Sequence, residues 1–166
     1  MDEPEQDDTL EYAQKYVKDN QAKGVRCPCC ARMVKEYHYT INSGQALAII
    51  VIYRLTKQLS PEDGWIHILK AFGEHTKLNP QSLSFHRLKL WGLLEQQPTN
   101  DDPKKKTSGY WRITDIGKEF VLGTSKVKKG VYVLDGTITH FGEEDVDIHA
   151  ALREKFNYET LMGSIS

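Results

Sequence analysis

Residues 80–123 constrain the fold of this chain most, because their hydrophobic pattern changes from helix to strand and back within a short distance. Apolar residues recur at helical spacing over residues 81–91, and a glycine then ends the helix before a strand that begins at residues 93–95. Residues 98–109 are rich in turn formers and charge, which is typical of an exposed hairpin loop. Residues 110–113 supply the partner strand. The stretch therefore predicts a helix followed by a β-hairpin with a long, basic loop.

Two more helices are predicted upstream of this stretch. Residues 44–59 have a broad apolar face, and Ser43 stands where its side chain can cap the first turn. The next helix is expected to open at the Ser60-Pro61 step, because proline suits the first turn of a helix, and to continue through Phe72. Residues 44–91 are thus predicted to place three helices directly before the hairpin.

Downstream of the hairpin, the chain predicts a short helix, a second hairpin and a final helix. Thr114 is placed to cap a helix over residues 115–122, and the acidic residue in its first turn suits the helix dipole. The second hairpin is expected to turn at Asp135-Gly136, a dipeptide that two-residue turns prefer. A last amphipathic helix is expected over residues 145–162. Residues 124–166 are therefore predicted to extend the central domain by a hairpin and a helix.

The N-terminal part precedes the predicted domain of residues 44–123. Residues 1–8 hold few apolar side chains, and we expect them to form a disordered acidic tail. Apolar residues at helical spacing predict a short helix from Thr9, and alternating residues over 34–41 predict one or two short strands. Residues 9–43 are therefore predicted to be a helix and a cysteine-containing segment.

The charges are unevenly distributed along the chain. Residues 1–20 carry seven acidic and two basic side chains, residues 21–125 carry nine acidic and fifteen basic ones, and residues 126–166 carry seven acidic and five basic ones. A positive middle between acidic ends is typical of a phosphate-binding core, and it is also compatible with an ordinary solvated surface. No apolar run approaches the roughly 20 residues that a membrane-spanning helix needs, and the acidic N-terminus is unlike a signal peptide. We therefore expect a cytoplasmic protein without a membrane partner, in the host cell if it is viral.

Three cysteines lie in one short segment, Cys27-Pro28-Cys29-Cys30. The spacing of Cys27 and Cys30 resembles one knuckle of a zinc ribbon, in which a tight turn lets two thiolates reach one tetrahedral ion. A structural zinc ion needs four ligands, and the others could come from Cys29, His38, His140 or the cysteines of a second subunit. Cys27, Cys30 and His38 are the candidate ligands within one chain. A redox pair and a metal-free turn are the alternatives.

The sequence LKLWGLLEQ, followed by SGYWRITDIGKEFV, resembles the end of the recognition helix and the wing of winged helix-turn-helix regulators. Such proteins often carry a leucine, then glycine, leucine, isoleucine and glutamate, and then an aromatic strand that ends at a threonine-capped helix. The resemblance covers residues 44–122, about half of the chain. It implies an α+β fold with a winged-helix core, and the layout is similar to that of small phage or bacterial regulators.

In a helix-turn-helix, the second helix of the pair enters the major groove of DNA. The resemblance gives this position to residues 81–91, with Phe85, Leu88 and Trp91 facing the core. The basic hairpin loop would be the wing, although Asp101-Asp102 departs from the family pattern because these carboxylates would repel phosphates. The side chains expected to contact double-stranded DNA are Gln81, Ser82, Ser84, Arg87, Lys89, Lys104, Lys105 and Lys106.

No arrangement of residues predicts catalysis, since the sequence has no phosphate-cradling glycine loop, no nucleophile elbow and no HExxH motif. The acidic residues 143–147 precede a predicted helix, where they are expected to act as caps. We therefore expect a DNA-binding protein that is not an enzyme, acting as a transcriptional regulator or accessory factor. The apolar stripes of the first and last predicted helices favour a homodimer. The alternative is an adaptor or phage-type inhibitor that binds a protein partner with the same scaffold.

Overall fold

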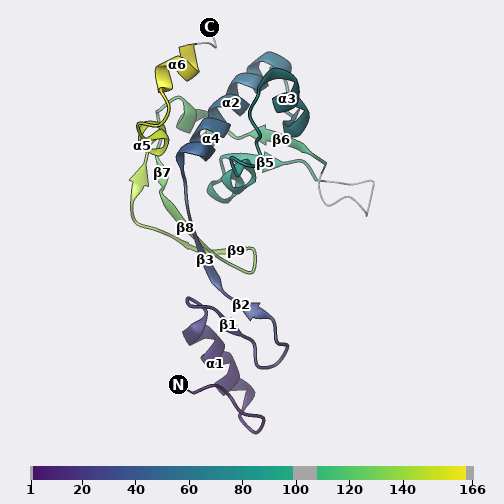
Figure 1. Ribbon diagram of the computed structural model, residues 1–166, viewed down its shortest axis with the longest axis vertical. Coiled ribbons are helices and arrows are strands. Elements are labelled where there is room, and N and C mark those ends of the chain that lie inside the picture. The colour runs from purple at the N-terminus through teal and green to yellow at the C-terminus, as the bar shows by residue number, and fades with distance from the viewer. Residues whose placement is uncertain (1, 99–107, 164–166) are drawn as a thin grey trace. The chain divides into compact units, whose positions relative to one another are not determined.

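The computed structural model describes residues 2–98 and 108–163, and its fold is of the predicted α+β class, with helices and several small sheets (Figure 1). The chain divides into two compact units, each built from segments that are far apart in the sequence. Unit 1 contains the residues up to Thr40 together with Gly130–Gly142. Unit 2 contains Ile41–Lys129 together with the residues from Glu143 onward. Within the described ranges, the structure has no helix long and apolar enough to cross a lipid bilayer.

Unit 1 consists of a helix and two small antiparallel sheets. Its helix α1 (Leu10–Asn20) begins where the sequence predicts, because the Thr9 hydroxyl accepts a hydrogen bond from the backbone N–H of Tyr12. The strands are β1 (Val25–Arg26) and β2 (Met33–Val34) in one sheet and, in spatial order, β3 (Glu36–Thr40), β8 (Gly130–Leu134) and β9 (Thr137–Phe141) in the other.

The second sheet of unit 1 combines a predicted hairpin with a pairing between distant segments. β8 and β9 turn at Asp135 and Gly136, whose φ angles of 49° and 77° are both positive, as a two-residue hairpin turn requires. The hairpin at Asp135-Gly136 is therefore confirmed. On its other side β8 pairs with β3, which joins the N-terminal segment to residues near the C-terminus. The sequence pattern carries no information on this second pairing.

Unit 2 is built around one long helix, α2 (Ser43–Leu59), whose middle is buried. It packs against elements from both ends of the unit, and its apolar side chains include several with no exposed surface: Ala46, Ala48, Ile49, Ile50 and Ile52. The helix is predicted almost to the residue, but its cap is Asn42 and not Ser43. The Asn42 side chain accepts from the backbone N–H of Gln45, and the Gln45 side chain accepts from the backbone N–H of Asn42. This reciprocal pair satisfies two backbone donors, which explains why Asn42 takes the capping position.

The helix predicted from Ser60-Pro61 starts later than expected. Ser60 ends α2, and the Ser60 hydroxyl and the backbone N–H of Trp65 both donate to the Asp63 carboxylate, at 2.6 and 3.1 Å. These bonds hold residues 60–65 in a turn, and they lower the pKa of Asp63, with the Ser60 hydroxyl as the main cause. The chain then forms the short strand β4 (Ile66–His67) before helix α3 (Ile68–His75). Local side-chain hydrogen bonds thus replace the predicted first turns of the helix.

Three further elements follow α3, and two of them complete the sheet that contains β4. They are the 3₁₀ helix η1 (Phe85–Trp91) and the strands β5 (Leu94–Gln96) and β6 (Tyr110–Ile113). β6 lies in the middle of the sheet, since it pairs with β5 on one side and with β4 on the other. The predicted hairpin strands are therefore confirmed, and β4 has no counterpart among the predicted strands.

The rest of unit 2 closes over α2. Helix α4 (Asp115–Val121) is capped by the Thr114 hydroxyl, which accepts from the backbone N–H of Gly117 at 3.0 Å, as predicted. The single helix predicted over residues 145–162 is wrong. In its place are β10 (Asp145–Val146), paired with β7 (Val127–Lys128), and two short helices, α5 (Ile148–Leu152) and α6 (Tyr158–Gly163). The helix is interrupted at Arg153, whose φ of 56° is incompatible with a right-handed helix.

Candidate nucleic-acid interface

The predicted recognition helix is a 3₁₀ helix, and it starts at Phe85 instead of residue 81. Side chains three residues apart eclipse one another in a 3₁₀ helix. Phe85, Leu88 and Trp91 form one such row and are buried, as predicted. The spacing of three between these residues therefore fits the 3₁₀ geometry. The other residues of η1 form two further rows that are not buried.

The two outer rows of η1 differ from the predicted contact face. Lys89 is exposed and shares its row with His86, which is also exposed, whereas Arg87 is half-buried. His86 is absent from the predicted contact residues, although residues three apart also lie on one face of an α-helix, so its spacing from Lys89 was a usable signal. Partial desolvation, and then the positive charge of Arg87, lower the pKa of His86, so this imidazole is neutral near pH 7 and offers hydrogen bonds instead of charge.

The remaining predicted residues of this segment lie in the turn before η1. Gln81 and Ser82 are exposed, and both bond to Asn79: the backbone N–H of Gln81 donates to its side chain, and the Ser82 hydroxyl donates to its carbonyl. Ser84 is half-buried at a φ of 55°, and its carbonyl accepts from the Gln45 amide. Lys104, Lys105 and Lys106 lie outside the described residues. Of the predicted contact residues that are described, Gln81, Ser82 and Lys89 present exposed side chains.

The segment around η1 carries no acidic side chain. Residues 75–94 contain Lys77, Arg87 and Lys89 and no Asp or Glu. Lys77 is exposed, like Lys89. A polyanion could therefore approach the described part of this segment without meeting a carboxylate from it.

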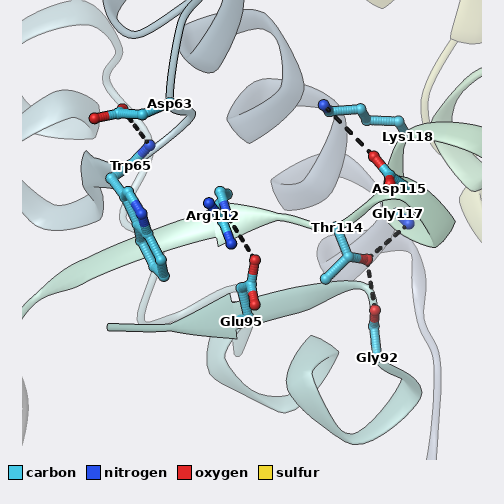
Figure 2. A network of polar contacts seen from close by, with 9 residues as sticks. All are labelled: Asp63, Trp65, Gly92, Glu95, Arg112, Thr114, Asp115, Gly117 and Lys118. Carbon is cyan, nitrogen blue, oxygen red and sulfur yellow. Dashed lines mark hydrogen bonds and ion pairs between the residues drawn. The ribbon is translucent and has the colours of Figure 1, made fainter. Parts of the chain in front are cut away.

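The hairpin beside η1 is braced by polar contacts at its base, which Figure 2 shows. The Arg112 guanidinium on β6 forms an ion pair with Glu95 on β5 and lies 4.5 Å from the centre of the Trp65 ring. At the same base, just outside the Leu94–Ile113 pair, the Thr114 hydroxyl donates to the Gly92 carbonyl at 2.6 Å. These contacts tie the start and end of the hairpin to the surrounding elements. Arg112 thus already has a carboxylate partner, and its role here is to hold β5 and Trp65 against β6.

The indole of Trp91 connects η1 to β7, because its Nε1–H donates to the Lys128 carbonyl at 2.6 Å. Replacing Trp91 by phenylalanine is expected to lower the free energy of unfolding of unit 2 by about 1 kcal/mol, since a partly buried carbonyl loses its donor. Denaturant unfolding followed by the fluorescence of the two remaining tryptophans, Trp65 and Trp111, measures this loss. An unchanged unfolding midpoint would show that water replaces the indole without cost.

The cysteines occupy the turn between β1 and β2 in unit 1. All three are free thiols; Cys29 and Cys30 are exposed and Cys27 is half-buried. Hydrogen bonds from the backbone N–H of Cys30, and then from that of Cys29, lower the pKa of the Cys27 thiol. The structure thus brings Cys27 and Cys30 together, at 3.6 Å.

The third predicted ligand, His38, belongs to a different cluster. Its ring stacks on Tyr132 with ring centres 4.3 Å apart, and Tyr132 stacks in turn on His140 at 4.1 Å. Within residues 2–98 and 108–163, no three His, Cys, Asp or Glu side chains are grouped so that they could hold a metal ion. His38 is therefore not grouped with Cys27 and Cys30 in one three-ligand site.

Comparison with known proteins gives no relative: no family model, no curated protein and no solved structure matches this chain.

Proposed function

We propose that the protein is a winged-helix DNA-binding protein that serves as a transcriptional regulator or an accessory DNA-binding factor. The observation that carries the proposal is the order α2, β4, α3, η1, β5, β6, combined with a sheet in which β4 and β5 flank β6. Three helices, with a short strand after the first, and a closing hairpin that pairs with that strand are the layout of a winged helix. In such a domain, η1 has the position of the recognition helix.

The exposed groups of η1 and of the turn before it are suited to DNA. Lys89 supplies a positive charge for a phosphate or a guanine edge, and Gln81 and Ser82 supply hydrogen bonds to bases or phosphates. The segment offers few cations, so we expect modest affinity with a measurable dependence on salt. Each phosphate that a lysine neutralises contributes about −0.9 to the slope of log K against log salt concentration.

The proposal is tested by a gel-shift assay with pooled genomic fragments at two salt concentrations, followed by sequencing of the retained DNA. A retained pool that is enriched in one sequence and released by salt supports a sequence-specific DNA reader. Absence of retention at low salt contradicts the proposal. That outcome favours the alternative, an adaptor or inhibitor that binds a protein partner, and a pull-down would then identify the partner.

Replacing Lys89 by glutamine is expected to weaken binding to all sequences alike and to reduce the salt slope by about 1, because one cation is removed from an exposed position. Arg87→Ala is expected to relax the sequence preference as well, since arginine has the better bidentate geometry for guanine. Equilibrium titrations at four or more salt concentrations provide both quantities.

The matched control is Lys118→Gln, which removes the same charge from α4 in the same unit, where Lys118 lies 3.9 Å from Asp115. This variant should keep the salt slope of the unaltered protein. Equal changes in both variants would mean that only the net charge of the protein matters, and the contact model for η1 would be wrong.

A further inference from the structure

The cysteine turn has the backbone geometry of a two-thiolate metal clip. The backbone N–H of Ala31 donates to the Cys27 carbonyl, and the backbone N–H of Cys27 donates to the Arg32 carbonyl, both at 2.8 Å. Ala31 has a φ of 59°, in the left-handed region, which alanine rarely occupies because of its Cβ. A strained residue at the end of such a turn persists only where the surrounding hydrogen bonds fix it. The left-handed conformation of Ala31 reverses the direction of the chain directly after Cys30.

The separation of the thiols fits zinc. Two sulfurs that bind one tetrahedral zinc ion, at about 2.3 Å each, are about 3.8 Å apart. The Cys27–Cys30 pair lies at 3.6 Å and is not a disulfide.

One chain supplies only half of a closed tetrahedral site. The sequence has three cysteines, whereas a structural zinc ion takes four ligands. Among the described residues, no histidine, cysteine or carboxylate is grouped with Cys27 and Cys30 as a third ligand. The cysteines of a second copy of the chain can supply the two remaining zinc ligands.

We propose that two copies of this chain share one zinc ion, each contributing the thiolates of Cys27 and Cys30. A tetrahedral ion has a two-fold axis that exchanges one pair of ligands for the other. It can therefore lie on the symmetry axis of a dimer in which both subunits use the same surface. Binding releases the thiol protons to solvent and involves no change in oxidation state.

The surroundings of the thiols suit such a dimer. Cys27 and Cys30 line a cavity of about 480 Å³ in unit 1, together with Met33 and Tyr37, whose side chains are 57% and 47% exposed. A second copy on the same surface would remove this apolar area from water. The cavity is also lined by Arg32 and Lys35. Four thiolates around one Zn²⁺ leave about two negative charges, which these cations from each copy would offset.

The experiment is native mass spectrometry of the full chain, purified in the presence of zinc, with zinc content determined in parallel. We expect a species of two chains and one zinc ion, which a strong chelator converts to metal-free single chains. A species of one chain with one zinc ion, a dimer that survives the chelator, or protein that binds no zinc would each overturn the proposal.

Variants separate the clip from the neighbouring thiol. Cys27→Ser and Cys30→Ser are expected to abolish both zinc binding and dimerisation, whereas Cys29→Ser should retain both. Retention in Cys30→Ser, or loss in Cys29→Ser, would assign the ligands wrongly and overturn the proposal. Circular dichroism of each variant, compared with the chelated parent protein, distinguishes loss of the site from loss of the fold. The readout uses no DNA, so its outcome is independent of the DNA-binding proposal.

Discussion

Gly117→Ala is expected to lower the free energy of unfolding of unit 2 by about 3 kcal/mol, the upper part of the range for overpacked sites. Gly117 lies in the first turn of α4, and a Cβ atom built on it would be 2.3 Å from the Leu93 carbonyl oxygen and 2.7 Å from the Ile113 side chain. The nearer obstacle is backbone, so it cannot rotate away. Leu93 and Ile113, at the end of β6, would have to move away from α4.

The control for this variant is Gly73→Ala. Gly73 also lies in a helix, α3, but a Cβ atom built on it would have no neighbour within 4 Å. This substitution should raise stability by about 0.5–1 kcal/mol, because alanine loses less backbone entropy in a helix than glycine. Denaturant unfolding followed by tryptophan fluorescence is specific for unit 2, since Trp65, Trp91 and Trp111 all belong to it. If the two variants unfold at the same denaturant concentration, α4 does not pack against Leu93 as described.

The elements that the sequence predicts well are those fixed by local signals. The Thr114 cap and the Asp135-Gly136 turn each depend on one or two residues whose backbone preference is strong, and both are present. Helix α2 is found because its broad apolar face recurs at helical spacing and no proline interrupts it before Ser60. In these segments local propensity and tertiary packing agree.

The elements that the sequence does not predict depend on partners far along the chain. β4 has only two residues, and β6 is what makes it a strand. In the same way β3 and β8 pair across most of the sequence. The Ser60-Pro61 step carries a valid helix-start signal, but Asp63 uses the same polar groups to build a turn. Hydrophobic periodicity cannot distinguish these outcomes, because it reports which side is buried and not what covers it.

The sequence predicts only the buried side of the candidate interface, because periodicity reports burial and not the contacts of the exposed side. The buried row of Phe85, Leu88 and Trp91 follows from spacing alone, whereas the exposed rows depend on the helix type. A spacing of three over three residues is compatible with an α-helix and with a 3₁₀ helix, and in either one His86 lies beside Lys89. The cysteine turn was also predicted in part. The C-x-x-C spacing predicts the Cys27–Cys30 pair, but it carries no information on His38, which lies in a different cluster.

Leu88→Ala is expected to lower the free energy of unfolding of unit 2 by about 3 kcal/mol, from the lost transfer free energy of the side chain and the cavity that remains. Leu88 is the middle residue of the buried row of η1 and has no exposed surface. In a chain of this size, a loss of that magnitude corresponds to a decrease in melting temperature of roughly 10 °C. Leu69→Ala is the matched control, because Leu69 on α3 is 47% exposed, and it should change stability by about 0.5 kcal/mol.

The same variant separates the support of η1 from its contacts. Leu88 is buried and cannot reach a ligand. If the proposed DNA binding is correct, Leu88→Ala should therefore keep the salt slope of the unaltered protein at a temperature where it is folded. Lys89→Gln should show the opposite behaviour, with unchanged stability and a smaller slope, because Lys89 is exposed. Salt titrations and unfolding curves of the two variants measure both properties. If Leu88→Ala alters the salt slope while folded, or if Lys89→Gln lowers stability as much, the division of η1 into a buried row and a contacting row is wrong.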